Sequence, residues 1–324
     1  LPWLQAGGRI AFNKSGDEIK WPIKIKRRPL QYGGHFQAIT FPSYDLRENA
    51  VLPYRTCYIP EAVDKFSKLK NRGSEAIVKL YVNLVKEIMA DMKEAFCDEL
   101  YIDGNASGNT KRIHGLESCL SVSGASAFTA TNNDTYASLS TTLGDLGGSW
   151  TGTWPNGTGD PEYHAWTPPV VDYTYAGWTA STDTWPNTCV EAMRFALVKT
   201  QKFGDPIDLV MLEDELYRQW LHNMDDKERI QVQNGKGKGR LANMGFGDVQ
   251  NFDGVEVTWE YGTPASVGYG LNRDALEIWS MQSTLFNSEA TDFDLATTSE
   301  RHLCDFYGNM KMNPRGLFKL KNVT

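Results

Sequence analysis

Apolar residues recur at helical spacing through residues 74–98 of this chain. Ser74 is a favourable N-cap residue, and Glu75 lies in the first turn, where a negative charge stabilises the helix. This pattern predicts one amphipathic helix with a length of about 37 Å, followed by a turn at residues 103–105. Its apolar face comprises Ile77, Leu80, Tyr81, Leu84, Val85, Ile88, Met89, Met92 and Phe96.

The residues before this helix show the alternating pattern of extended chain. Ile19, Trp21 and Ile23 alternate with polar or charged residues, and Pro22 restricts the segment to a sheet edge or an arm. We therefore interpret residues 1–30 as an N-terminal arm.

Residues 31–66 are predicted to form a long hairpin. The glycine pair 33–34 opens it, the polar stretch 45–49 forms its tip, and residues 52–59 return as a strand rich in tyrosine and β-branched residues. A long two-stranded hairpin is marginally stable by itself, so this one requires a partner surface.

Further helices and strands are predicted in the second half of the chain. A helix begins at Asn187 or Thr188 and runs to Lys199, a buried strand occupies 207–212, and a second helix spans 213–223. The glycine-rich residues 234–247 form a loop. Strands are then expected at 253–257, 267–272 and 276–279, and the chain closes with a paired-strand tail from 302–304 to 316–320.

Residues 121–183 differ from the rest in composition. Ser, Thr, Gly and Trp dominate, which predicts short strands and long loops, and no Lys or Arg occurs from Ile113 to Met193. The tryptophans either stack on sugars as an exposed platform or pack in a core or a subunit interface. They are Trp150, Trp154, Trp166 and Trp178.

Charge is unevenly distributed along the 324 residues. The net charge of −7 gives no general case for nucleic-acid binding, yet residues 1–73 carry 13 Lys and Arg against 6 Asp and Glu. A basic arm and an acidic body could dock on each other in different subunits, or composition could simply drift along the chain. No apolar run approaches the roughly 18–20 residues that span a bilayer, and the five widely spaced cysteines fit reduced thiols.

The motifs that could carry chemistry are incomplete. The loop from Gly235 to Arg240 lacks the Ser or Thr that follows Gly-Lys in a phosphate-binding loop, so we interpret it as a solvated loop. No two of the five histidines lie four residues apart, and the acidic residues 213–215 are explained by the helix dipole. The sequence therefore predicts no catalytic residue, no cofactor site and no metal site.

In their order and spacing, these segments resemble the major capsid proteins of tailed phages, which share the HK97-like shell fold. The patches that carry the resemblance are Asn71-Arg72-Gly73-Ser74-Glu75-Ala76-Ile77 at the start of the long helix, Leu100-Tyr101-Ile102-Asp103-Gly104 with Ile113-His114-Gly115-Leu116 after it, Pro206-Ile207-Asp208-Leu209-Val210-Met211 with the helix that bears Tyr217, and the C-terminal strands.

The resemblance implies an α+β, HK97-like fold and a structural protein that is not an enzyme. Its parts would be an N-terminal arm at 1–30, an extended E-loop at 31–66, a peripheral (P) domain at 67–204 and 291–324 with an insertion within 121–183, and an axial (A) domain at 205–290. Copies would assemble as pentamers and hexamers into an icosahedral phage head around double-stranded DNA. Scaffold, portal and decoration proteins are further implied partners, with no membrane. The implied location is the virion, after assembly in the host cytoplasm.

Intersubunit contacts are expected in two loops. The expected contact residues are Asp45, Arg47 and Glu48 at the hairpin tip, and Lys236, Lys238 and Arg240 in the glycine-rich loop.

Two alternative functions stay open. An encapsulin-like shell that houses cargo protein is the alternative with the same fold, and a Trp-rich carbohydrate-binding module is a third possibility.

Overall fold

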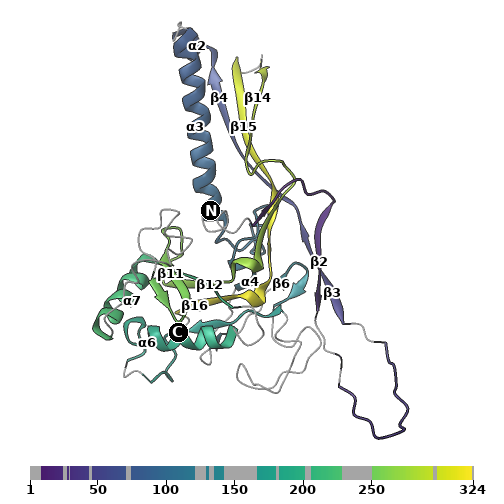
Figure 1. The fold of residues 1–324 in the computed structure, drawn as a ribbon. Helices are drawn as coiled ribbons and strands as arrows, with labels where there is room; N and C mark the ends of the chain where they lie inside the picture. The colour runs from purple at the N-terminus through teal and green to yellow at the C-terminus, as the bar shows by residue number, and fades with distance from the viewer. Residues whose placement is uncertain are drawn as a thin grey trace, which may run out of the picture. The chain divides into compact units, whose positions relative to one another are not determined.

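Segments far apart in the sequence come together in two units in the computed structural model (Figure 1). Unit 1 comprises Leu1–Asp17, Pro53–Ser118 and Leu276–Met312, and unit 2 comprises Glu18–Leu52, Cys119–Ala275 and Asn313–Thr324. The residues that the structure describes are 9–24, 28, 30–43, 46–70, 74–120, 129–130, 135–141, 166–179, 182–200, 206–227, 250–294 and 298–322.

Unit 1 contains the long helix that the sequence predicts. Helix α3 spans Ser74–Glu99 and so extends one residue beyond the expected 74–98; the short helix α2, Lys65–Lys70, precedes it. Ile88, Met92 and Phe96 recur every four residues and retain only 2–4% of their exposure. This stripe is the apolar face that the periodicity indicates.

A single long strand, β15, organises the sheet of unit 1. It spans Ser299–Met312. Along one edge, β15 pairs first with β14 (Asn287–Asp294) and then with β13 (Leu276–Ser280), and along the other it pairs with β4 (Arg55–Asp64). Strand β1 (Ile10–Ala11) joins β13 in parallel. Phe306 of β15 meets Phe96 of α3 edge-on, with ring centroids 4.9 Å apart, which ties the helix to the sheet.

Unit 2 is built on a mixed sheet of seven strands in the order β10-β11-β9-β12-β16-β8-β5. The interior strand β9 pairs in parallel with β11 and antiparallel with β12. The strands are β10 (Gln250–Phe252), β11 (Val255–Trp259), β9 (Leu209–Leu212), β12 (Val267–Leu271), β16 (Leu317–Lys321), β8 (Val170–Asp172) and β5 (Thr129–Ala130).

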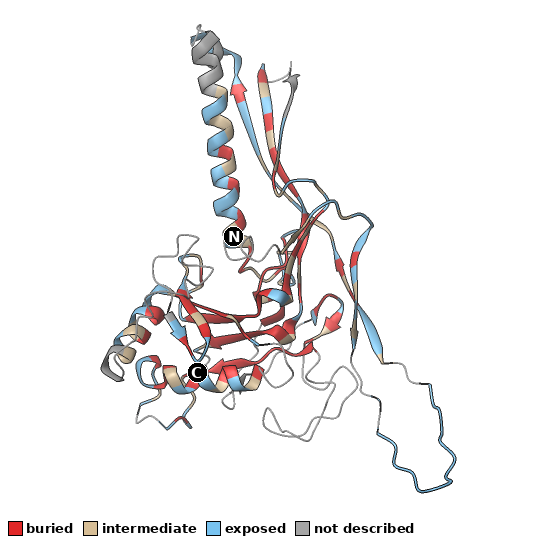
Figure 2. Cartoon of the chain, in the orientation of Figure 1, coloured by how far each residue is buried: buried red, intermediate tan, exposed pale blue. Residues whose placement is uncertain are grey.

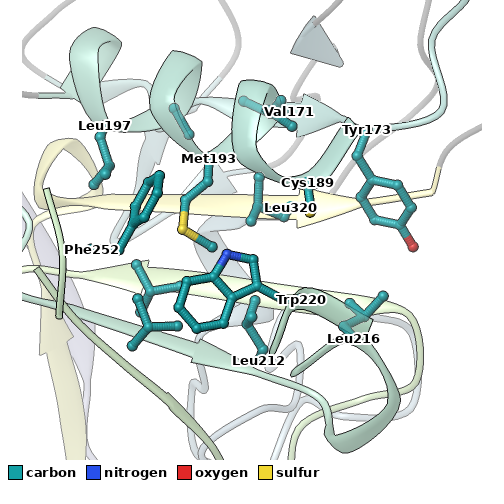
Figure 3. Packing of buried hydrophobic residues seen from close by; sticks show 14 of the residues in the cluster. Val171, Tyr173, Cys189, Met193, Leu197, Leu212, Leu216, Trp220, Phe252 and Leu320 are labelled. Atoms are coloured by element: carbon teal, nitrogen blue, oxygen red, sulfur yellow. The ribbon is translucent and has the colours of Figure 1, made fainter. Parts of the chain in front are cut away.

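Helices α6 (Trp185–Thr200) and α7 (Asp214–Lys227) pack against this sheet and bury an apolar core (Figure 3). Trp220 of α7 is fully buried there, and its ring centroid lies 6.0 Å from that of Phe252. Strand β12 can pass close to β16 because it carries glycine at position 270. A Cβ at this position would lie 2.0 Å from the Phe318 ring. The core therefore depends on the small residue in β12 as much as on the large ones around it.

The structure of residues 31–66 differs from the predicted hairpin. Strand β3 (Arg47–Pro53) pairs with β2 (Glu18–Lys24), whereas β4 belongs to the sheet of unit 1. The predicted pairing of the hairpin was therefore wrong, because residues 30–43 form no strand. The alternation at Ile19, Trp21 and Ile23 did predict β2 correctly, and the two-stranded ribbon leaves Pro22 on an edge.

The prediction of a paired-strand tail was also wrong. Residues 302–304 lie in β15 and residues 317–320 lie in β16, but these strands belong to different sheets. A 3-10 turn, η4 (Pro314–Gly316), separates them, and a second 3-10 turn, η3 (Arg273–Ala275), separates β12 from β13. Both strand locations were right, but proximity in sequence did not decide which strands pair.

The other elements lie close to their predicted positions. Helix α6 begins at Trp185, two residues before the expected start, and α7 continues four residues past the expected end at Asn223. Within 121–183, the described residues form short strands, as expected: β5, β6 (Thr135–Tyr136), β7 (Leu139–Ser140) and β8. The short helix α4 spans Glu117–Leu120.

A buried polar cluster in unit 1 joins three segments. The backbone N–H of His114 donates to Asn309 Oδ1 at 3.0 Å. Asn309 Nδ2 donates to the carbonyl oxygen of Pro53 at 2.7 Å and lies 2.9 Å from His114 Nδ1. Since the amide nitrogen can only donate, Nδ1 accepts this hydrogen bond. Burial, reinforced by the positive charge of Arg55, lowers the pKa of His114 to about 4.

This cluster predicts a pH dependence of stability. The pKa of His114 is lowered from 6.5 in the unfolded chain to about 4 in the folded chain, so the unfolded state binds more protons between these values. The stabilisation is present above pH 6.5 and is lost as the pH falls towards 4, by about 2 kcal/mol at pH 5. Urea unfolding at pH 7 and pH 5 should therefore show a smaller pH-dependent loss for His114→Gln than for the wild type. Equal losses would show that His114 does not contribute.

Candidate assembly surface

Residues 30–43 extend from the β2–β3 ribbon of unit 2 (Figure 2). This segment is called the arm from here on and is distinct from the N-terminal arm expected at 1–30. Every residue of the arm is exposed, and none lies in a helix or strand. Figure 2 shows it as a continuous pale-blue trace beyond the ribbon. A folded chain does not gain hydrophobic stabilisation from side chains that remain in water, so the composition of the arm indicates what it contacts.

The arm carries large apolar side chains that its own subunit leaves in water. This apolar content is unlike that of an ordinary solvated loop, which is polar. Five such side chains within 14 residues could bury roughly 800 Å², one partner's share of a standard-size interface. The residues and their exposed fractions are Leu30 76%, Tyr32 88%, Phe36 106%, Ile39 72% and Phe41 89%.

A hydrogen-bonded turn shapes the middle of the arm. The backbone N–H of Gln37 donates to the carbonyl oxygen of Gly34 at 3.3 Å, and the Gly34 N–H donates to Gln37 Oε1 at 2.9 Å. Phe36 sits in this turn with φ at 63°, in the left-handed region that a side chain rarely adopts. A bulky ring is thus presented at the point where the chain turns.

Unit 1 carries a second set of exposed apolar side chains on α2, α3 and β4. Tyr58 of β4 and Phe66 of α2 are 64% and 61% exposed. Leu69 of α2 and Val82 of α3 are 49% and 45% exposed. These four residues are further exposed apolar side chains of unit 1.

The expected contact residues are only partly described. Arg47 and Glu48 begin β3 and have exposed side chains, so they lie on the ribbon beside the arm and not at a hairpin tip. Asp45 lies outside the described residues, as do Lys236, Lys238 and Arg240. The sequence signal for the exposed arm is a run of large apolar residues without a helix or strand to bury them, which the search for charged contact residues did not consider.

No group of three or more His, Cys, Asp or Glu in the described part of the chain could hold a metal ion. Burial raises the pKa of the Cys57 thiol to about 12, which keeps it protonated and unreactive. Trp166 and Trp178 retain 0% and 7% exposure, so neither offers a free face to a sugar.

A charged cluster in unit 2 joins Arg273 to two acidic side chains. Arg273 Nε donates to Asp208 Oδ2 at 2.6 Å, and its Nη2 donates to Glu256 Oε2 at 3.1 Å. The Arg273 side chain is 10% exposed. Removing either acid would therefore leave its buried positive charge with one negative partner fewer. These residues serve the fold of unit 2.

Within the described residues, no helix is both long enough and apolar enough to cross a membrane.

The fold is similar to that of capsid chains in solved structures. The capsid protein of cyanophage A-1(L) matches with a TM-score of 0.63 and 13% identity, over 100% of this chain and 93% of its own length. The capsid of a native GTA particle matches with a TM-score of 0.60 and 8% identity, over 99% and 91%, and that of Myoviridae phage XM1 with 0.54 and 13%, over 99% and 91%.

No family model matches this sequence, and no curated protein matches it. The structural matches nevertheless cover nearly all of both chains. They show that the chain has the α+β, HK97-like fold, as the order of its sequence segments predicted.

The exposure of the arm predicts that its apolar side chains contribute little to the stability of a single subunit. The double variant Phe36→Ser/Phe41→Ser should change the free energy of unfolding of the unassembled chain by no more than about 0.5 kcal/mol, as expected for surface substitutions. Urea denaturation of the monomer, followed by tryptophan fluorescence, measures this change. A loss of several kcal/mol would show instead that the arm packs on its own subunit.

Proposed function

We propose that this chain is a major capsid protein that assembles as pentamers and hexamers into an icosahedral phage head enclosing double-stranded DNA. The observation that carries the proposal is the match to capsid chains over the full length of this chain, at a TM-score of up to 0.63 among those described above. In this proposal, the protein is a structural component of the virion, assembled in the host cytoplasm, and its principal partner is a second copy of itself.

The arm supports this proposal independently of the comparisons. Its five large apolar side chains are exposed in the single subunit, and burying apolar surface contributes about 25 cal/mol per Å². A neighbouring copy supplies the missing contact surface in a closed shell, where every subunit both gives and receives an arm. The ribbon β2–β3 with its arm would then be the E-loop, spanning residues 18–53 and not 31–66.

We further propose that unit 1 corresponds to the P domain and unit 2 to the A domain with the E-loop. Unit 1 holds the long helix α3 and the long strand β15, and unit 2 holds the sheet around β9. Helix α6 and strand β16 fall in unit 2, and β13 in unit 1. The proposed A domain is thus larger than the expected 205–290 at both ends but lacks 276–290.

Purified wild-type protein, with a scaffold protein if one is required, should yield closed shells in negative-stain electron microscopy. The variant Phe36→Ser/Phe41→Ser should remain folded by circular dichroism but assemble poorly, because its arm offers less apolar surface. The matched control Phe36→Leu/Phe41→Leu keeps that surface and should assemble. A wild type that stays monomeric at high concentration under all of these conditions would contradict the proposal.

The contents of shells recovered from the natural source distinguish this proposal from an encapsulin-like compartment. Nuclease-protected double-stranded DNA supports a phage head, whereas a protein cargo without DNA supports the compartment. Scaffold, portal and decoration proteins would be further partners of a phage head.

We also propose that Lys236, Lys238 and Arg240 crowd a symmetry axis of the capsomer. Five or six copies would bring like charges together, which is unfavourable unless salt or acidic neighbours screen it. Replacing all three residues with Ser should therefore leave assembly intact or strengthen capsomers at low salt, as measured by sedimentation at low and high ionic strength. Weaker capsomers in the variant at low salt would oppose this placement.

A further inference from the structure

The root of the β2–β3 ribbon is held by a small hairpin from the 121–183 segment. The backbone N–H of Val51 in β3 donates to the carbonyl oxygen of Ala137 at 2.9 Å, and the Ser138 hydroxyl donates to the carbonyl oxygen of Val51 at 3.3 Å. Both backbone polar groups of Val51 are thus bonded to the turn between β6 and β7. The flanking residues Ala50 and Leu52 retain 0% and 1% exposure, so this part of β3 is fixed although the arm is exposed.

The turn that makes these bonds is conformationally unfavourable by itself. Tyr136 pairs with Leu139, which leaves Ala137 and Ser138 as a two-residue loop with φ of 50° and 65°. Glycine and asparagine are the usual residues for such a turn, because a Cβ disfavours positive φ. A strained conformation persists where its surroundings determine it, and here the bonds to Val51 do so.

Three aromatic rings close the same region. Trp21 of β2 lies 6.5 Å from Tyr136 and 6.3 Å from Trp166, measured between ring centroids, and Tyr136 stacks on Trp166 at 5.9 Å. Tyr136 and Trp166 are fully buried, and Trp166 Nε1 donates to the carbonyl oxygen of Leu139 at 3.4 Å. The rings come from the ribbon, the hairpin and a third segment, so they join all three.

We propose that Trp21, Tyr136, Trp166 and the Ala137-Ser138 turn form a root clamp that fixes the direction of the arm before a neighbouring subunit binds it. The inference rests on the proposed function, because it assigns these residues to the positioning of the arm for assembly. An arm fixed at its root loses less conformational freedom on docking than an arm that swings freely. Part of the 121–183 segment is therefore an assembly element acting within its own subunit.

Hydrogen exchange of the Val51 amide in the unassembled full-length chain tests the clamp directly. Trp21→Ala should make this amide exchange about tenfold faster, because an aromatic contact is lost and local opening becomes easier. Ser138→Ala removes only the hydroxyl bond and should accelerate the same amide while leaving the rings in place, so it remains informative if Trp21→Ala does not fold. Trp259→Ala, at a tryptophan of β11 that is 42% exposed and lies outside the clamp, is the control and should leave Val51 exchange unchanged.

Assembly of the same variants tests the positioning role. If the clamp reduces the population of misdirected arms, Trp21→Ala should lengthen the half-time of shell formation by about tenfold, measured by light scattering. The arm variant Phe36→Ser/Phe41→Ser should impair assembly while leaving Val51 exchange as in the wild type. Unchanged Val51 exchange in both clamp variants, or faster exchange with an unchanged assembly half-time, would overturn the inference. If the wild type forms no shells, the proposed function fails, and the exchange experiment still judges the clamp separately.

Discussion

The arm of this protein carries large apolar side chains that its own subunit cannot remove from water. Phe36 and Phe41 are almost fully exposed, and no strand or helix of residues 30–43 offers them a core. Hydrophobic burial is the main favourable term in both folding and association, so this surface represents stabilisation that becomes available only when another molecule covers it. In the proposed assembly, the β2–β3 ribbon of unit 2 presents the arm to a neighbouring subunit.

Each unit is held together by different interactions. Unit 1 relies on one long strand, β15, which pairs along both edges and packs Phe306 against Phe96 of α3. Unit 2 relies on a mixed sheet that buries Trp220 and Phe318 beneath two helices, with glycine in β12 to permit the close approach. The β2–β3 ribbon is joined to the rest of unit 2 through Val51 and Trp21. Specific polar bonds and ring contacts therefore set the geometry, whereas apolar volume sets the stability.

Long, strongly periodic elements were predictable, and pairings between distant strands were not. The apolar stripe of residues 74–98 determined α3 almost to the residue, because i, i+4 spacing is a local property of the chain. The alternation of Ile19 with Trp21 and Ile23 likewise located β2. The partner of the strand expected at 52–59 was misassigned, since alternation shows that a segment is extended but does not say which strand lies beside it.

The sequence by itself determined the helices, most strand positions and the order of segments that resembles a capsid fold. Only the tertiary structure decided that β15 and β16 join different sheets, that β4 pairs with β15, and that the large apolar side chains of the arm stay exposed in the single subunit. It also decided that Ala137 and Ser138 adopt positive φ, which nothing in their local sequence favours. The physical reason is that periodicity and turn chemistry act over a few residues, whereas exposure and strand pairing depend on which distant segments come to lie side by side.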